Sequence, residues 1–386
     1  MILTLIRYSI LFLILWYLPS FLLAYVSSGL GSLSSYATSL LLIAYFFLSK
    51  ERRKPLLVFV ALGLSYFLIS AINYTEIDVN NYFIKEFIRF MIVVICGAAV
   101  LYQTRDKEIF YILLIGASSI IINAVFLPSM QLAIFGESYG RFSGFYLNPN
   151  LAGSICLLGY SLSHAIKNIK WKIIGQIVFT LAGLLTLSRT FIAIWLLLTI
   201  ISIYYNRKNI IAPIIGALLL ILIFTFSGKL TLNAERFQAL QGVLGQEKGN
   251  TQMIGEDTRN DTWSIYYNLI FDKPFVGHGF RKFQMKAAGL PGVHNSYLMT
   301  IGEAGIIPFL LIVGIYLYLL IKSYLFIRSH PWYFYLSLTL VFSMMGGHGY
   351  FYNFVSILLS MYVFIKLKDL SSIHTSEIEI SNNINH

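Results

Sequence analysis

The sequence predicts an all-α polytopic membrane protein with about twelve transmembrane helices and one long periplasmic loop that contains short helices. Three observations support this prediction. First, 57% of the residues are hydrophobic and 12% are charged, whereas a soluble protein carries about 25% charged residues. Second, apolar runs of 15 or more residues recur twelve times along the chain. Third, most Lys and Arg residues lie in alternate short connections between these runs.

The apolar runs have the length that a lipid bilayer requires. About 20 helical residues cross the hydrocarbon core, and most of the runs reach this length singly. The first run follows Arg7 and is interpreted as a retained helix, because it is too long for a signal peptide and lacks a clear small-residue cleavage site. The runs cover 4–26, 32–49, 55–73, 84–102, 109–128, 150–166, 173–187, 191–205, 210–226, 297–321, 333–347 and 350–365.

The charged loops predict the orientation. With the N-terminus in the cytoplasm, sixteen Lys and Arg residues fall on the inner side, and the short outward segments hold only Lys85, Arg89, Arg141 and Arg189. This distribution follows the positive-inside rule and predicts both termini in the cytoplasm. The formal net charge of +11 is therefore a sign of topology and does not indicate nucleic-acid binding.

The chain divides into four regions. Residues 1–226 contain the first nine helices, 227–296 form the periplasmic loop, and 297–369 contain the last three helices. The 370–386 segment is polar and is expected to be a disordered cytoplasmic tail.

The periplasmic loop is expected to carry helices of its own. Its eight Lys and Arg residues are nearly balanced by six Asp and Glu residues, so it is not a single-sign charge patch. We expect helices over 233–242 and 258–271, and the second places Arg259 and Trp263 on one face at i and i+4. A long loop with this organisation is typical of a lid or a docking platform.

Two short apolar segments, 173–187 and 191–205, are joined by Ser-Arg-Thr at 188–190. Fifteen helical residues reach only about 22 Å, less than a hydrocarbon core of about 30 Å. The turn is therefore expected to lie below the outer membrane surface and to carry Arg189 with it. The alternative is an arginine that extends to the interface.

Ionisable side chains gather where the long loop re-enters the membrane. His294 and Asn295 precede the tenth apolar run, and Glu303 lies about two helical turns further on. Such groups at a membrane edge are functional candidates, and histidine exchanges protons near neutral pH. The alternatives are structural for two of them: His294 as a packing residue and Asn295 as a helix N-cap. For Glu303 the structural role is favoured, and it is expected to neutralise an arginine such as Arg189.

Arginines from several outward segments are expected to approach His294. Arg189 lies in one turn, and Arg259, Arg281 and Lys282 lie in the long loop. Because a guanidinium group binds phosphate oxygens in a bidentate manner, such a cluster predicts a pocket for phosphate or pyrophosphate. A solvated loop face is the alternative for Arg281 and Lys282.

For other residues on outward segments, the sequence indicates a structural role or leaves the role open. Asn148 and Pro149 indicate a helix start, and His278 is expected to fill a turn between two glycines. His348, Arg89 and Arg141 also lie on outward segments, and the sequence leaves open the roles of all four residues, namely His278, His348, Arg89 and Arg141.

The sequence contains no Asp-x-Asp pair, HExxH, P-loop, G-x-S-x-G or Cys/His metal spacing. Cys96 and Cys156 lie in apolar segments and are interpreted as packing residues. One histidine and several arginines, with no metal or cofactor, suit the transfer of a group that a phosphate leaving group has activated. The arginines would offset charge on the phosphate, and His294 would accept the proton of the incoming hydroxyl or position it.

Four passages resemble the O-antigen ligase and O-antigen polymerase superfamily of bacterial envelope enzymes. They are R-F-S-G-F-Y-L-N-P-N-L-A-G at 141–153, L-S-R-T at 187–190, R-N-D-T-W…D-K-P-F-V-G-H-G-F at 259–280 and V-H-N-S-Y-L…G-E-A-G-I-I at 293–307. The resemblance covers most of 140–321 and includes the late periplasmic loop, and the order and spacing of the motifs make it specific.

This resemblance implies a helical inner-membrane glycosyltransferase that needs no metal or cofactor. The implied donor is a glycan on undecaprenyl pyrophosphate, and the acceptor is another glycan or lipid A–core. Membrane lipid and a chain-length regulator are the further implied partners. By similarity, His294 matches the essential loop histidine of the family, and Arg189 and Arg259 match its pyrophosphate-facing arginines.

Several activities share these motifs. The compact, Ile-, Phe- and Tyr-rich chain favours an O-antigen polymerase, which adds a glycan to a lipid-linked repeat unit. The alternative is an O-antigen ligase, which transfers the glycan to lipid A–core; protein O-oligosaccharyltransferases are longer chains. A non-enzymatic polysaccharide flippase is a more distant alternative, because the sequence shows no repeated halves and its charges gather at the outer face.

Overall fold

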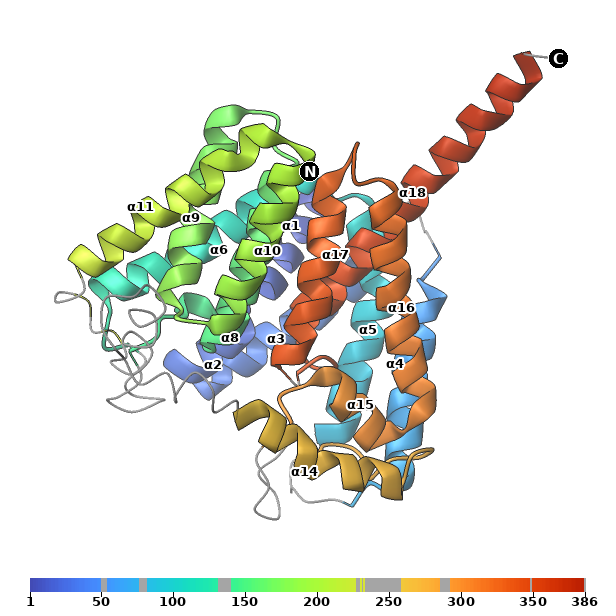
Figure 1. The fold of residues 1–386 in the computed structure, drawn as a ribbon. Helices are drawn as coiled ribbons and strands as arrows, with labels where there is room; N and C mark the ends of the chain where they lie inside the picture. The colour runs from blue at the N-terminus through green and yellow to red at the C-terminus, as the bar shows by residue number, and fades with distance from the viewer. Residues whose placement is uncertain are drawn as a thin grey trace.

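The computed structural model describes residues 1–49, 54–75, 82–130, 140–226, 230, 232, 258–284, 292–347 and 349–384. Within these ranges all regular secondary structure is helical, which confirms the predicted all-α class. The helices form a bundle whose two chain ends lie at one end, while α14 and α15 lie at the opposite end (Figure 1).

The helices follow the apolar runs closely. The α-helices are α1 Ile2–Leu15, α2 Leu18–Tyr25, α3 Ser28–Leu48, α4 Leu57–Ile72, α5 Tyr82–Tyr102, α6 Asp106–Phe126, α8 Pro149–Ser163, α9 Ile169–Leu185, α10 Arg189–Tyr205, α11 Ile211–Thr225, α14 Thr258–Asp272, α15 Ser296–Ala304, α16 Ile306–Leu325, α17 Pro331–Ser343 and α18 Phe354–Ile384. Short 3-10 helices are η1 Gly144–Tyr146, η2 Arg207–Ile210 and η4 Met344–Gly346.

Three of the described helices, α3, α6 and α16, are long and apolar enough to cross a membrane, and the bent pair of α1 and α2 makes a fourth if it is one span. Others are apolar but shorter, such as α4 with 16 residues and α10 with 17. The expectation of twelve spans around one periplasmic loop therefore stays a prediction.

Two apolar runs that we expected to be single helices are broken. The first run bends by 58° between α1 and α2. At this bend Tyr17 has a left-handed backbone with φ 56°, and Pro19 occupies the first turn of α2. Trp16 donates a hydrogen bond from Nε1 to the carbonyl of Ile112 at 2.8 Å, which holds the bend against α6.

The second broken run divides at Gly305 into α15 and α16. Gly305 has φ 76°, and a Cβ at this position would overlap the carbonyl of Phe275. The amide of Ile306 donates to the carbonyl of Pro274 at 2.9 Å. The break therefore exists because the segment after α14 packs directly against it, which only glycine permits.

The predicted disorder of the C-terminal tail is wrong for the residues that the structure describes, because α18 is helical from Phe354 to Ile384. No glycine or proline occurs between these two residues, so nothing in the local sequence interrupts the helix. The helix expected over 258–271 is confirmed as α14, and the one expected over 233–242 lies outside the described residues.

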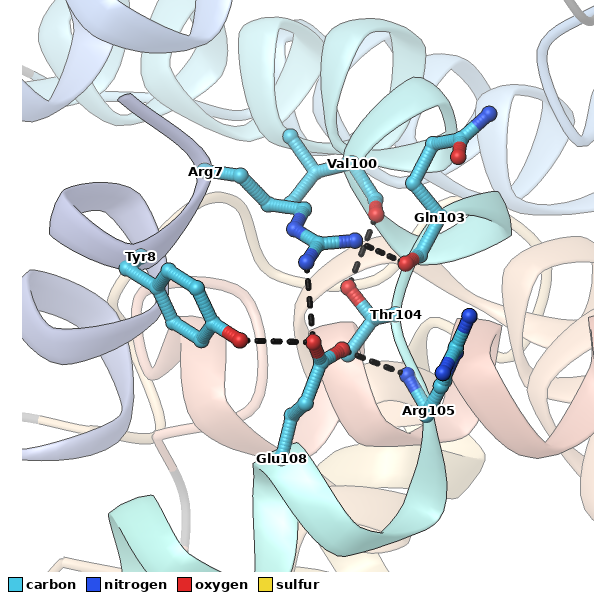
Figure 2. Close-up of polar contacts among 7 residues, drawn as sticks. All are labelled: Arg7, Tyr8, Val100, Gln103, Thr104, Arg105 and Glu108. Atoms are coloured by element: carbon cyan, nitrogen blue, oxygen red, sulfur yellow. Dashed lines mark hydrogen bonds and ion pairs between the residues drawn. The ribbon is translucent and has the colours of Figure 1, made fainter. Parts of the chain in front are cut away.

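A polar cluster joins the start of the chain to the α5–α6 connection (Figure 2). Nη2 of Arg7 lies 2.8 Å from Oε1 of Glu108, and the hydroxyl of Tyr8 donates to the same oxygen at 2.7 Å. Arg7 also donates to the carbonyl of Gln103, and Oε2 of Glu108 accepts from the amide of Arg105 at 2.8 Å. We call these residues the Glu108 cluster; it ties α1 to the N-terminus of α6.

Helix α8 is the central helix of the second half of the bundle and is buried over most of its length. It packs against α6, α9, α10 and α17. Gly159 lets the ring of Phe179 from α9 lie against the α8 backbone, where any Cβ would overlap it. This close packing fixes the position of both ends of α8, at each of which the structure has a cavity.

Candidate functional site

A cavity of about 270 Å³ lies where several helices begin. Residues from the first turns of α8, α10, α15 and α18 line it, together with the end of α17 and η4. We call it the outward cavity, because the topology predicted from the sequence places these helix starts on the outer side. Its polar lining includes Asn148, Asn150, Thr190, His294, Ser296 and Asn353.

His294 lies at the wall of this cavity with an exposed side chain. Its backbone is left-handed, with φ 46°, a conformation that is uncommon for residues other than glycine and is often found at functional sites. Hydrogen bonds fix the residue before it, because Val293 donates its amide to the carbonyl of Phe283 at 3.1 Å and accepts from Nε1 of Trp263 at 3.1 Å.

Asn295, the residue after His294, is the N-cap of α15. Its side-chain oxygen accepts from the amides of Tyr297 at 3.0 Å and Leu298 at 3.2 Å. Asn295 thus has the capping role that the sequence left as the structural alternative. The hydrogen bonds of Val293 and the helix cap at Asn295 fix the backbone on both sides of His294. The imidazole therefore reaches the cavity wall from a fixed backbone position.

Four helix N-termini contribute to the outward cavity. Asn148 caps α8 as predicted, Ser188 caps α10 by accepting from the amide of Phe191 at 3.4 Å, and Asn353 accepts from the amide of Val355 at 3.2 Å near the start of α18. A helix N-terminus carries about half a positive charge from its aligned peptide dipoles. Together with α15, these ends favour an anionic group in the cavity.

The three expected arginines have different environments. Arg189 is the first residue of α10 and is exposed, and its neighbour Thr190 lines the outward cavity. The side chain of Arg259 lies outside the described residues. Arg281, with φ 64°, forms an ion pair with Glu86 of α5. The guanidinium of Arg281 also lies over the ring of Tyr82, 4.4 Å from its centroid.

Glu303 is fully buried near the end of α15 and does not line the outward cavity. Its carboxylate accepts hydrogen bonds from the hydroxyl of Tyr66 at 2.5 Å, the amide of Phe283 at 2.9 Å and Nε2 of Gln284 at 2.8 Å. Among the described residues Glu303 forms no ion pair. The expected pairing with Arg189 is therefore replaced by neutral donors from α4 and from the segment after α14.

The same segment is attached to α4 and α15 by hydrogen bonds, including one from the amide of His278 to the carbonyl of Gly302 at 2.8 Å. Asn73 donates from Nδ2 to the carbonyl of Gly277 at 2.7 Å, and Phe280 donates its amide to Ser70 at 3.1 Å. The ring of His278 bonds to the carbonyl of Leu269 at 2.6 Å, in line with its expected place in a turn. These contacts give His294 a rigid support through Phe283 and Val293.

A smaller cavity of about 120 Å³ shares Tyr17 and Tyr352 with the outward cavity. Arg89 lines it, with its guanidinium 5.6 Å from the centroid of the Tyr36 ring. Arg141 donates to the carbonyl of Thr186 at 3.0 Å and to Asn150, which lines the outward cavity, at 3.1 Å. Arg89 is thus the arginine that the structure places on the adjoining cavity, and His348 lies outside the described residues.

Several residues of this site could not be identified as functional from the sequence. Tyr66 lies inside an apolar run, where a tyrosine that binds a carboxylate cannot be distinguished from one that packs against lipid or other helices. Thr190 and Asn353 are short polar residues at helix starts, and their position in a cavity wall depends on how α10 and α18 meet. The only local signal was the N-cap pattern before each helix.

Within the described ranges, no three His, Cys, Asp or Glu side chains gather closely enough to hold a metal ion. No protein-family model, curated protein or solved structure matches this chain.

Proposed function

We propose that this protein is a bacterial inner-membrane glycosyltransferase that polymerises a surface polysaccharide. The donor would be a glycan on undecaprenyl pyrophosphate, and the acceptor a lipid-linked repeat unit on the periplasmic side. One observation carries the proposal: His294 lies at the wall of a cavity lined by the first turns of four helices. This arrangement combines a proton acceptor with a site that favours an anion.

The chemical step follows from this pairing. The acceptor hydroxyl attacks the anomeric carbon of the donor, and the bond from that carbon to the pyrophosphate oxygen breaks with its electron pair on the pyrophosphate. His294 takes the hydroxyl proton as general base. The helix N-termini stabilise the charge on the leaving pyrophosphate, and Arg89 and Arg189 supply positive charge near the cavity.

The support behind His294 fits this role. A general base must stay within hydrogen-bond distance of one hydroxyl, so its backbone must be held in a fixed position. Val293, Asn295 and the buried Glu303 network hold the segment on both sides of His294. An O-antigen ligase would use the same donor and base, and would differ in the acceptor, lipid A–core.

The experiment compares His294→Ala with His330→Ala in cells and in membranes. His330 lies between α16 and α17 and does not line the outward cavity, so it is a matched control. We expect His294→Ala to insert normally and to lose transfer by about 10²- to 10⁴-fold, the usual contribution of a general base. His330→Ala should keep transfer.

The glycan that accumulates after loss of activity distinguishes a polymerase from a ligase and from a flippase. Loss of a polymerase leaves lipopolysaccharide that carries a single repeat unit. Loss of a ligase leaves no attached glycan and lets lipid-linked polymer accumulate, whereas loss of a flippase strands repeat units on the cytoplasmic face. Wild-type glycan chains at normal protein level in the His294→Ala strain would refute the catalytic role.

A further inference from the structure

A larger cavity, of about 550 Å³, lies at the other end of α8. Its lining comes from the α8–α9 connection, the end of α10, and the α16–α17 connection. We call it the inner cavity. The fifteen residues of α8 separate it from the outward cavity, about 22 Å along the helix axis. It lies toward the bundle end that carries both chain ends (Figure 1).

The inner cavity is basic. Lys172 and Arg328 line it, and the described residues of its wall include no Asp or Glu. In the part of the chain that the structure describes, neither cation forms an ion pair. The ammonium of Lys172 instead donates to Oδ1 of Asn209 at 3.3 Å, and Asn209 is oriented by its own hydrogen bond to the carbonyl of Ser202 at 3.0 Å.

Burial makes the charge of Lys172 costly. Removal of water from around the ammonium lowers the pKa of Lys172 below its ordinary value. An anion that enters beside a partly buried cation offsets this cost through its Coulomb attraction. The inner cavity therefore favours a ligand of negative charge.

His164 adds a buried polar atom to the same wall. Its Nε2 is buried and has no hydrogen-bond partner among the described residues. Its ring is fixed between Tyr160 and Tyr335, with ring centroids 5.5 Å and 5.1 Å away. An imidazole that is held this firmly in the wall of a basic cavity can donate a hydrogen bond from Nε2 to a ligand oxygen.

The surroundings of the inner cavity indicate where such a ligand comes from. Tyr204 lines the cavity and is 83% exposed, and Leu325, two residues before the lining residue Ile327, is 66% exposed. Trp171, beside Lys172 in α9, is also exposed. Exposed aromatic and aliphatic side chains next to basic residues are typical of a membrane interface. The cavity thus opens beside an apolar surface suited to acyl chains.

We propose that the inner cavity binds the phosphate group of an anionic membrane lipid. Lys172, Arg328 and His164 would contact the phosphate oxygens through charge-assisted hydrogen bonds, and the lipid tails would lie on the exposed apolar residues. Basic pockets between membrane helices on the cytoplasmic side bind lipid head groups in this way. The inference needs membrane insertion but not glycosyl transfer, so either can fail without the other.

The test measures ligand binding to the purified full chain in detergent by native mass spectrometry and by the shift in Tm. The probes are phosphatidylglycerol, phosphatidylcholine with the same tails, and inorganic phosphate. The double variant Lys172→Gln/Arg328→Gln removes both cations. The matched control Lys170→Gln/Arg207→Gln removes one Lys and one Arg that lie nearby in α9 and η2 but do not line the cavity.

We expect phosphatidylglycerol to bind and to raise Tm, and phosphatidylcholine to do neither. The affinity should fall in the cavity variant by roughly tenfold for each cation that is removed, and should be kept in the control. Equal protection by inorganic phosphate would retain a phosphate site but overturn the lipid as its source. Equal weakening in both variants, or no binding of either anion to the wild type, would overturn the site.

Discussion

Two glutamates, the partly buried Glu108 and the fully buried Glu303, have similar partners but different effects on the molecule. Each accepts a short hydrogen bond from a tyrosine of another helix, Tyr8 at 2.7 Å and Tyr66 at 2.5 Å. Glu108 also has a cation, Arg7, at 2.8 Å, whereas Glu303 has only neutral donors within the described residues. The first carboxylate closes a contact between helices, and the second supports the wall of a cavity.

The kind of partner therefore matters, beyond burial, for what a charged residue does in this helical bundle. In the Glu108 cluster the carboxylate pairs with the guanidinium of Arg7 and accepts from Tyr8 and Arg105 (Figure 2). A carboxylate held by a tyrosine, an amide and a glutamine depends on the backbone that carries them. Glu303 thus couples the segment after α14 to the residue that faces the outward cavity.

The largest effect on stability should come from Glu108→Ala. This change removes the counter-ion of the partly buried Arg7 and the acceptor of the Tyr8 and Arg105 hydrogen bonds, which together should cost about 2–4 kcal/mol, less than the loss of a fully buried pair. Unfolding in detergent, followed by tryptophan fluorescence, would measure the loss. The rate of glycosyl transfer per folded molecule should stay at the wild-type level. A variant as stable as the wild type would show that the Glu108 cluster does not stabilise the contact between α1 and α6.

Glu303→Gln should give a smaller loss of stability and a larger loss of transfer. The glutamine keeps the volume, but its NH₂ group must face one of the three donors, which costs about 1–3 kcal/mol for a buried unsatisfied group. The displaced segment should move Val293 and lower the transfer rate. Glu108→Gln is the matched control; if the two variants lose transfer equally, Glu303 has no special coupling to the cavity.

The smallest expected effect is a difference between two asparagine helix caps at opposite ends of the bundle. Asn148 caps α8 at the outward cavity, and Asn168 caps α9 at the other end. Each Asn→Ala variant should lose about 1 kcal/mol of stability. Only Asn148→Ala should also weaken donor binding, measured as a rise in KM. An equal KM in both variants would argue against anion binding by the α8 N-terminus.

Local sequence signals predicted those features that depend on a few neighbouring residues. The apolar runs identified the helices, and the caps at Asn148 and Asn295 were predictable because an N-cap binds amides two or three residues away. The break before Arg189 followed from the Ser-Arg-Thr between two apolar runs, and α14 followed from its own pattern. His294 was marked by its position between a charged loop and an apolar run.

The remaining features depend on tertiary structure, because their partners are far apart in the chain. Tyr66 and Glu303 are 237 positions apart, and Arg281 and Glu86 are 195 positions apart. No local sequence pattern predicts either pair. The division at Gly305 likewise depends on the carbonyl of Phe275, which packs there only in the folded bundle. Composition and periodicity thus dictated that helices form, and the packing of distant helices dictated which polar side chains meet.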